Sequence, residues 1–583
     1  APAYVGGKVD HYENAYSYSG GADLKVGLNE SFTMDMTLLP DFSQVQSDDK
    51  VKNLTAFEQI FKERRQFFNE GTALFNTGKL FYSRRIGKTP TLFYSVIDSL
   101  QPGEELIRNP TAAHLLNSVK LSGRTNSGLG IGVMNSITGN TYAEIKKADG
   151  GKRSILTEPL TNYSIMVLEQ QLKNNSNVWL VNTNTMRDGK NRDANVYSTG
   201  TTLENKLHSL RFTGRYANSR VWEYNADNQK TQKNGHQASL SMEKISGKIQ
   251  FGSTFEFGDK NFDKNDLGFI FLNNYSMANI YGSYNLFNPF LKIFREGSAD
   301  VYINREGRWS ENNQLTNLFA GSNVFLLFNN MWSFFMNVNT SLAAGKDWYE
   351  PRVAGQYYIA PKNTFVNFDF STSYNKPLAF NYGFNFDRSP AIEQHGFGCY
   401  VQPIIRLNDH FSFNLNTYFQ KNNDARGFCT FDSLSAPVFG RRDVKTLVNT
   451  LGARYQFSPK MSLNLSVRHY WSQGVYDRYY HLLSDGTLDA YSNNADGSLP
   501  FNANFNSNFF NVDFVFNWIF SPGSSLLITY KDQIYSENDL VALNYSNNLS
   551  NTLHQPQTNS LALKVLYYLD YERVVSKHKP IKN

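Results

Sequence analysis

Apolar and polar side chains alternate with a period of two along much of the chain. The sequence LAFNYGFNFD (378–387) places four aromatic side chains on one face and asparagine, glycine and aspartate on the other. The same alternation recurs in 363–373, 410–420, 461–468 and 510–520. Strict alternation predicts β-strands with one apolar and one polar face. The runs also match the roughly 10 residues that a tilted strand needs to cross a hydrocarbon layer.

The connections between these runs are of two kinds. Tight turns are expected at NKP (375–377), LND (407–409), SPK (458–460) and SPG (521–523). Long polar stretches, expected to be loops, cover 342–361, 421–444, 471–506 and 534–556. Short turns at one end and long loops at the other are typical of transmembrane barrels, and the pattern predicts about 24 strands, with an uncertainty of about two to four.

Closure of such a sheet follows from the physical chemistry of lipid. Every backbone N–H and C=O group must be paired there, and an open sheet edge leaves a row unpaired. We therefore predict an all-β protein, a large transmembrane antiparallel β-barrel with a polar inner face and a short helical plug-like insertion. The alternative is a soluble all-β propeller or solenoid, but the sequence has no repeat of about 40–50 residues.

Composition and charge narrow the class of protein. Aromatic residues make up 15% of the 583 residues and charged residues 19%, which is the reverse of a disordered chain. The sequence contains no run of about 18 apolar residues, so a membrane-spanning helix is not expected. The net charge of +6 is mild and scattered, so nucleic acid is not an expected partner. The sequence begins at Ala1 rather than Met, which suggests a processed or trimmed product.

One segment interrupts the strand pattern: LPDFSQVQSDDKVKNLTAFEQIFKERRQFFNEG, residues 39–71. Leu54, Phe57, Phe61 and Phe68 follow helical spacing, and Asn53 could cap the start, so an amphipathic helix over 54–68 is expected. A barrel of this size has a wide lumen and usually carries a plug. Three placements compete: the lumen or its mouth, which we favour, the periplasmic rim, and a partner protein. A purely structural plug and a substrate gate both remain open.

The expected organisation has four parts. Residues 1–38 hold an N-terminal segment and the first barrel strands, and 39–79 the plug-like insertion. Residues 80–571 form the barrel with long extracellular loops, and 572–583 a basic C-terminal tail.

Charged residues of the insertion and of two arginine pairs are the candidate plug and lumen residues. They are Asp41, Asp48, Glu63, Arg64, Arg65, Glu70, Arg84, Arg85, Arg441 and Arg442. Arg84 and Arg85 are expected to meet one or more of the acidic residues in a structural ion-pair cluster. Arginine rows in a lumen also favour anions, although two pairs do not make a selectivity filter.

Candidate covalent and catalytic chemistry is sparse. Cys399 and Cys429 are the only cysteines, and they are either a disulfide pair or two separate thiols. The sequence has no GxSxG, HExxH, Walker or CxxC motif, so no enzyme activity, cofactor or metal site is expected.

Several motifs together resemble one outer-membrane protein family of Gram-negative bacteria. They are PDFSQV (40–45), NLTAFE (53–58), KERRQFFNEG (62–71), LFYSRRIG (80–87), FGRRD (439–443) and RHYWS (468–472). In full-length members a family-nine carbohydrate-binding-like module precedes a large barrel domain of unknown function. The resemblance implies an outer-membrane β-barrel and no established activity. KERRQFF departs from the KRPFF-like run of other members, and the 583 residues do not include the N-terminal module.

Two functions fit this sequence best, and a third fits it less well. The first is transport or channelling of a solute, with oligosaccharide as the class that the carbohydrate-binding relatives suggest. The second is a scaffold or accessory subunit of an outer-membrane assembly or secretion complex. A surface hydrolase is the third. The expected partners are the lipid bilayer and lipopolysaccharide, with other outer-membrane or periplasmic proteins in the second case, and the expected location is the outer membrane with extracellular loops.

Overall fold

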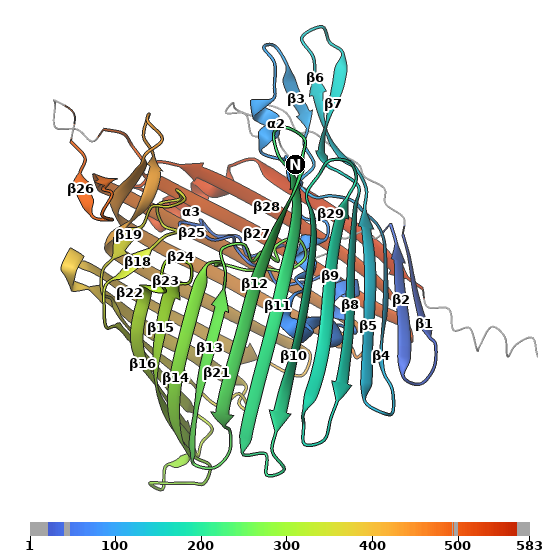
Figure 1. Ribbon diagram of the computed structural model, residues 1–583, viewed down its shortest axis with the longest axis vertical. Helices are drawn as coiled ribbons and strands as arrows, with labels where there is room; N and C mark the ends of the chain where they lie inside the picture. Colours follow the sequence, from blue (N-terminus) through green and yellow to red (C-terminus); the bar gives the residue numbers. More distant parts are fainter. Residues whose placement is uncertain (1–20, 40–46, 493, 495–499, 568–583) are drawn as a thin grey trace, which may run out of the picture.

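A single large antiparallel sheet dominates the protein (Figure 1). The computed structural model describes residues 21–39, 47–492, 494 and 500–567. The sheet has 24 strands, of which the three-residue β26 pairs only with the end of β25. The predicted all-β class and strand number are therefore confirmed.

The strands of the first half of the sheet are β1 (Ala22–Gly27), β2 (Phe32–Leu38), β4 (Leu115–Arg124), β5 (Leu129–Thr138), β8 (Thr161–Gln171), β9 (Asn177–Arg187), β10 (Asp193–Glu204), β11 (Leu210–Tyr224), β12 (Lys230–Lys244), β13 (Ile249–Gly258), β14 (Tyr275–Leu286) and β15 (Phe294–Arg308). Those of the second half are β16 (Gln314–Phe328), β17 (Ser333–Ser341), β20 (Thr364–Ser371), β21 (Leu378–Ser389), β22 (Gln394–Arg406), β23 (Phe411–Phe431), β24 (Pro437–Ser458), β25 (Met461–Leu482), β26 (Leu488–Ala490), β27 (Phe505–Ser521), β28 (Ser524–Asn538) and β29 (Gln557–Leu566).

Smaller elements decorate the sheet. They are the sheet of β3 (Glu105–Arg108), β6 (Thr141–Lys146) and β7 (Lys152–Glu158), the hairpin of β18 (Gly345–Asp347) and β19 (Tyr358–Ala360), the helices α1 (Gln66–Asn69), α2 (Ser95–Asp98) and α3 (Tyr545–Leu553), and the 3₁₀ turns η1 (Leu74–Lys79), η2 (Ser83–Arg85) and η3 (Pro390–Ile392). No helix in the described part of the chain is long and apolar enough to cross a membrane.

The alternation in the sequence sets the two faces of the sheet. On β21, Phe384 and Phe386 point outward beside their partners Cys399 and Phe397, while Asn385 between them points inward. Outward side chains such as Ile280 and Leu563 are well exposed, at 67% and 65%. An apolar outer face and a polar inner face are what a sheet surrounded by lipid requires.

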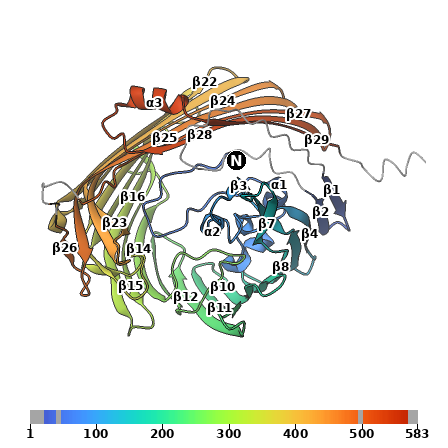
Figure 2. The ribbon, with the colours of Figure 1, turned by 90° about the horizontal axis from the view of Figure 1, so that it is seen from above.

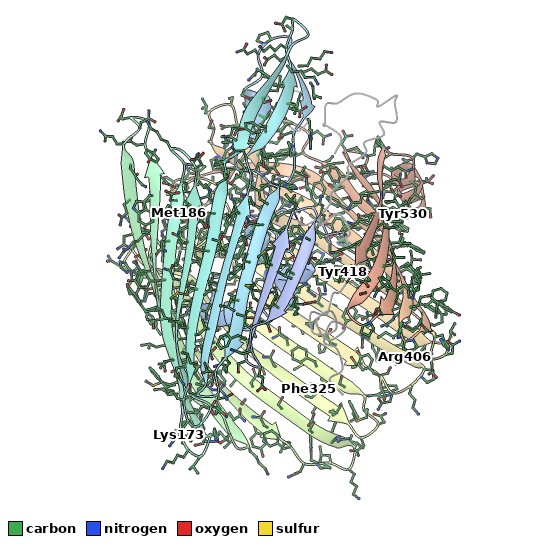
Figure 3. All side chains as sticks on the ribbon, turned by 90° about the vertical axis from the view of Figure 1, so that its right-hand side faces the viewer. Lys173, Met186, Phe325, Arg406, Tyr418 and Tyr530 are labelled. Atoms are coloured by element: carbon green, nitrogen blue, oxygen red, sulfur yellow. The ribbon has the colours of Figure 1, made fainter. Side chains whose placement is uncertain are left out.

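The tight turns between strands lie at one end of the sheet, as expected, but the expected long loops need one correction. The four predicted tight turns join β20 to β21, β22 to β23, β24 to β25 and β27 to β28 at one end of the sheet (Figure 1). In Figure 3, Lys173 in the turn after β8 and Arg406 at the end of β22 lie toward this end. The expected loop 421–444 is largely strand instead, and residues 471–482 of the expected loop 471–506 continue β25, because β23, β24 and β25 are 21, 22 and 22 residues long.

The predicted helix over 54–68 is wrong. Only Gln66–Asn69 is helical, and 48–60 is irregular. Asn53 does not cap a helix: its Oδ1 accepts from the Thr55 backbone N–H at 3.0 Å, and its amide donates to the Phe57 carbonyl at 2.6 Å. Side chain to backbone bonds of this kind offer the chain an alternative to the helix.

The predicted closure is not made by the described strands. Pairing runs without interruption from β1 through β2 and β4 to β28 and β29, but no backbone pairing joins β29 to β1 among these residues. Figure 3 looks on to these two edges.

Candidate functional site in the lumen

A folded segment, residues 47–87, lies within the curve of the sheet (Figure 2), and we call it the plug segment. Its apolar anchor is η1, where Leu74 and Phe75 pack against the inner faces of β5 and β8–β10. The inward side chains Tyr163, Ile165 and Val167 of β8 are buried beneath it. These inward positions are apolar, unlike most of the lumen wall, because they meet the plug segment instead of water.

Close packing of the plug segment on the wall requires glycine at one point. Gly78 has a φ of +71°, and a Cβ there would lie 2.8 Å from the Trp179 ring of β9. Glycine adopts this left-handed conformation without steric cost and leaves room for the ring.

Glu63 and Arg65 form the central ion pair of the plug segment. Arg65 Nη2 donates to Glu63 Oε2 at 2.6 Å and to the Ser83 carbonyl at 2.7 Å, while Nη1 donates to the Ile86 carbonyl at 2.8 Å. Ser83 Oγ also donates to Glu63 Oε2 at 2.6 Å. Burial opposes ionisation of Glu63, but the hydrogen bond and charge of Arg65 outweigh it and hold the pKa below the usual 4.5.

The other predicted charges of the plug segment are also paired. Arg84 binds Asp48, and Arg64 Nη2 lies 3.2 Å from Asp49 Oδ2. Arg85 binds Glu58 through both oxygens at 2.9 Å, a partner that was not predicted. Of the acidic residues expected to meet the two arginines, Asp48 pairs with Arg84, whereas the partner of Arg85, Glu58, lies outside the expected set. Asp41, another of the expected partners, lies outside the described residues.

The predicted candidate Glu70 joins the plug segment to the first strands. Its Oε2 lies 3.2 Å from Lys25 Nζ on β1, and Lys120 on β4 donates to the Phe67 carbonyl at 2.8 Å. Hydrogen bonding from Gln66 together with Lys25 holds the pKa of Glu70 below its usual value.

A second loop holds the plug segment from the opposite side. In the loop 259–274, Leu267 accepts from the Tyr82 N–H at 2.8 Å, and Gly268 accepts from Arg85 Nε at 3.0 Å. Lys264 Nζ donates to the Lys79 carbonyl at 2.8 Å, and its burial lowers the pKa of that amine to about 8. A Cβ on Gly268 would lie 2.6 Å from the Leu80 carbonyl oxygen, so the two backbones are in contact.

This loop is fixed to the wall by a buried ion pair. Asp266 Oδ1 lies 2.9 Å from Arg187 Nη1 of β9, with both side chains almost fully buried. Burial opposes ionisation of Asp266, and the neighbouring Arg192 and Arg187 outweigh it, so its pKa is lowered. The loop and the plug segment therefore form one packed unit.

Residues 47–61 form a strap that crosses to the C-terminal strands. The Ser47 hydroxyl donates to Asp513 Oδ1 of β27 at 2.9 Å and accepts from Gln533 Nε2 of β28 at 2.9 Å. Lys52 pairs with Glu537 of β28, and Arg468 of β25 donates to the Lys50 carbonyl at 3.0 Å. The strap is thus attached to three of the C-terminal strands, β25, β27 and β28.

The second predicted arginine pair lies apart from the first. Arg441 pairs with Asp477 and Asp424, and Arg442 Nη1 donates to the Tyr476 hydroxyl at 2.9 Å, all on β23–β25. The two arginines do not join Arg84 and Arg85 in one cluster, because their own strands supply their partners.

The disulfide alternative for Cys399 and Cys429 is wrong, because both thiols are free. Cys399 of β22 lies opposite Phe419 of β23, whereas Cys429 lies ten residues further along β23. At about 3.4 Å per residue this separates them by roughly 34 Å.

The inner wall of β14–β23 differs from the wall beneath η1. Its inward positions carry amides, hydroxyls and tyrosines, most of them partly exposed, and no lysine or arginine over their central parts. They include Asn279, Tyr281, Asp300, Tyr302, Asn323, Asn337, Asn339, Asn367, Asp369, Asn381, Asn385, Tyr400, Gln402, Tyr418 and Gln420. We call this surface the amide wall.

Side chains of the amide wall bond to one another across strands. Tyr302 donates to Asn339 Oδ1 at 2.6 Å, and Asn337 Nδ2 donates to Asn323 Oδ1 at 2.7 Å. Tyr400 donates to Asp369 Oδ1 at 2.9 Å. These bonds orient the groups while leaving further donors and acceptors directed at the lumen.

A cavity of about 430 Å³ lies on the amide wall at β14 and β15. Its lining is Asn279, Tyr281, Ser283, Asn285, Ser298, Asp300 and Tyr302. This volume falls in the range of small-molecule sites. Over the described ranges, no group of three or more His, Cys, Asp or Glu side chains is placed to hold a metal ion.

The functional features that sequence reasoning missed involve distant partners. Glu58, Asp49, Asp513 and Glu537 are ordinary acidic residues in the sequence, and the strap contacts join positions more than 400 residues apart. The polar halves of β14–β23 were visible as alternation, but nothing in one sequence shows which part of the wall the plug segment leaves uncovered.

The fold and this lumen define the protein class as a large antiparallel β-barrel protein of the transmembrane type, with an internal segment bound to its wall. The chain belongs to the family described as "Domain of unknown function (DUF5916)", whose model matches residues 2–578. A search of curated proteins found no match.

Solved structures with a similar arrangement include outer-membrane proteins. The FrpB iron transporter from Neisseria meningitidis (F3-3 variant) is 10% identical with a TM-score of 0.43, over 72% of this chain and 75% of that one. The siderophore receptor PirA from Pseudomonas aeruginosa is 11% identical with a TM-score of 0.43, over 79% and 76%. The outer membrane transporter YddB from Escherichia coli is 11% identical with a TM-score of 0.34, over 78% and 68%. Likeness at this level carries no argument about substrate or mechanism.

Proposed function

We propose that this protein is an outer-membrane barrel that passes a neutral, hydroxyl-rich solute of the oligosaccharide class along its amide wall. The observation that carries the proposal is the contrast between two parts of the inner face. Inward side chains of β8 and β9 such as Ile165 and Val181 are buried under the plug segment, whereas those of β14–β17 such as Asn279 and Asn337 keep exposed surface toward the lumen.

The chemistry of the amide wall favours this solute class. Amides and hydroxyls both donate and accept hydrogen bonds, which matches sugar hydroxyls better than it matches ions. Tyrosine rings such as Tyr281 and Tyr302 offer flat surfaces for the apolar faces of sugar rings. The central inward positions carry aspartates but no basic side chain to attract anions, and pore lining sets selectivity.

The outer-membrane location is part of the proposal. It is supported by the exposed apolar outer face, by strands of membrane-spanning length and by the short turns at one end. We place the long β23–β25 extensions outside the cell and the short turns in the periplasm. Lipopolysaccharide and the bilayer are then the surroundings of the outer face.

Solute uptake by liposomes containing the full chain tests the proposal. We expect swelling with neutral oligosaccharides and much slower swelling with anionic solutes of similar size. Ser283→Trp, which fills the cavity on β14, should reduce uptake several-fold, whereas Ile280→Trp, on the outward face of the same strand, should not. Equal rates for both variants and the unchanged protein would overturn the proposal.

A second candidate function rests on a different feature, the module of β3, β6, β7 and α2 that projects beyond the sheet (Figure 1). It exposes Tyr94, Ile97 and Tyr142, at 79%, 59% and 46%. Exposed apolar surface of this kind favours a protein contact, as expected of an accessory subunit in an outer-membrane complex. Cross-linking from a photoreactive residue at Tyr94 in intact cells tests this, and cross-links to lipid alone would count against it.

A further inference from the structure

The outer face of β23 and β24 carries a pair of lysines beside the exposed aromatic residues of β21 and β22. Phe386 and Phe397 lie opposite each other and point outward, with 47% and 38% of their surface exposed. Lys421 of β23 continues this row, because it lies directly opposite Phe397 on one side and Lys445 of β24 on the other. Opposed residues share a face of the sheet, so both lysines point outward.

The position of these lysines along their strands sets their level on the outer face. The outward residues nearer the tight turns are mostly apolar and include Phe413, Phe419 and Leu447. The next outward residues in the other direction, Asn423 on β23 and Asp443 on β24, are polar. The two ammonium groups therefore lie where the apolar outer face ends, on the side of the long loops. Basic residues at such a boundary are within reach of lipid phosphates.

An opposed pair of lysines is unfavourable without an anion between them. Like charges directly opposite each other destabilise a strand pair. Among the described residues neither ammonium forms an ion pair, and Lys445 Nζ lies 5.1 Å from the centre of the Trp471 ring. Asp424 and Asp477 are bound to Arg441 instead. Two positive charges on the outer face are thus left for a ligand.

A cavity of about 340 Å³ adjoins Lys421. Its lining is His395, Lys421, Asn423, Asp424, Asp443, Val475 and Asp477. Asp443 and Val475 are an outward pair, which places the cavity on the outer side of the wall and not in the lumen. The volume falls in the range of small-molecule sites, and the amide and carboxylate oxygens can accept hydrogen bonds from sugar hydroxyls.

We propose that this surface binds a phosphorylated glycolipid of the outer leaflet. One phosphate lies between Lys421 and Lys445, the sugar that bears it lies against the cavity, and the acyl chains lie along Phe386 and Phe397. Opposed side chains have Cβ atoms about 5 Å apart, so one phosphate can accept from both ammonium groups. The inference rests on the outer-membrane location that is part of the proposed function.

The surroundings of the lysine pair favour a glycolipid over a simpler anion. The carboxylates of Asp443 and Asp477 would repel a free anion that entered the cavity, whereas sugar hydroxyls can donate to them. The exposed rings of Phe386 and Phe397 would gain nothing from inorganic phosphate, but acyl chains would cover them. A phospholipid without a sugar would leave the cavity unfilled.

Binding of lipid A, a glycolipid with two phosphates, to the purified full chain in detergent tests the site. We expect lipid A to bind, as counted by native mass spectrometry, and to raise the unfolding temperature, because a ligand of the folded state stabilises it. The double variant Lys421→Gln, Lys445→Gln should bind about tenfold more weakly, since it loses charge-assisted hydrogen bonds to the phosphate. It should still fold, as shown by heat-modifiability on gels, because it removes two opposed like charges.

The matched control is the double variant Lys376→Gln, Lys460→Gln. These two exposed lysines lie in the tight turns at the other end of the sheet, and their loss changes the net charge by the same amount. The control should bind lipid A as the unchanged protein does. Equal binding by both double variants would overturn the proposal, and so would equal binding of lipid A from which the phosphates have been removed.

Two further ligands separate the possible sources of the phosphate. Inorganic phosphate should not raise the unfolding temperature, and phosphatidylglycerol should raise it less than lipid A does. An equal effect of either would show that the site takes an anion or any acidic lipid, and would overturn the assignment to a glycolipid. Liposome swelling without lipid A tests transport separately, so a failure of the site and a failure of the proposed function are distinguishable.

Discussion

Arg65 and Glu63 hold each other in a two-point ion pair: Arg65 Nε and Nη2 donate to Glu63 Oε1 and Oε2 at 2.9 and 2.6 Å, with both side chains about nine-tenths buried. Arg65 also satisfies two backbone carbonyls on the far side of the turn at 83–86. One guanidinium thus joins both halves of the plug segment.

Replacement of Arg65 by methionine should loosen the plug segment. The change keeps the length of the side chain but leaves the Glu63 carboxylate buried without its partner, which costs about 3–5 kcal/mol for a buried pair. Residues 61–86 should become sensitive to protease in membranes. Arg64→Met is the matched control: its partner Asp49 is largely exposed, so we expect about 0–1 kcal/mol and no change in cleavage. Equal cleavage of both variants would contradict this role.

Acid should release the same segment. The pKa of Glu63 is lower in the folded protein than its ordinary 4.5. The stabilisation it gives is therefore fully present above pH 4.5 and is lost as the pH falls through the folded pKa. Hydrogen exchange of 61–86 should accelerate below about pH 4.5. Glu63→Gln should exchange faster at neutral pH and lose this part of the pH dependence; an unchanged profile in that variant would assign the transition to another group.

Removing the hydrogen bonds between the strap and β27 should increase ion conductance through the barrel. Asp513→Leu removes the acceptor of both the Ser47 N–H and its hydroxyl. We expect conductance in planar bilayers to rise or to fluctuate between levels. Asn517→Leu is the control, because it lies on the same face of β27, four residues or about 14 Å away. If neither variant conducts in planar bilayers, the strap is not what limits conductance through the barrel.

A cation placed on the amide wall should change ion selectivity. Asn337 of β17 lies inward beside Asn323 and Asn339, and Asn337→Lys would add a positive charge where the central wall has none. Reversal potentials measured in a salt gradient should shift toward anions. Outward positions such as Val338 and Ser322 are poor controls, because a lysine there would lie in lipid. Asn337→Gln is the control: it keeps the wall neutral and should leave ion selectivity unchanged.

The free thiols predict simple behaviour. Cys399 and Cys429 should both react with a thiol reagent after denaturation without reductant, and reductant should not change the gel mobility of the protein. The double serine variant should keep the heat-modifiability of a folded barrel, because neither thiol is bonded to the other.

Much of the barrel could be predicted from the sequence, because the face to which a strand residue points depends on its immediate neighbours in the chain. Phe384 and Asn385 face opposite sides because successive side chains in a strand always do, so their faces follow from the sequence alone. The helix over 54–68 was mispredicted because Asn53 binds nearby backbone groups and Tyr82 binds both the N–H and the carbonyl of Phe61, at 3.0 and 3.1 Å. The Tyr82 contact comes from a different part of the chain.

For the plug segment, the sequence predicted the kind of contact, arginine with carboxylate, but not which residues pair. The arginines were expected to find carboxylates, and they do, but the choice of Glu58 for Arg85 depends on how the backbone folds between them. The uncovered amide wall depends on where η1 rests, which a single sequence does not record.

The attachment of Ser47 to Asp513 and Gln533 also sets an order of events during assembly. These contacts join positions 466 and 486 residues apart. Contacts so far apart in the chain form late, since the loop between them must be closed first. The strap therefore reaches its final place only after the hairpin of β27 and β28 has formed, and its docking would mark a completed barrel.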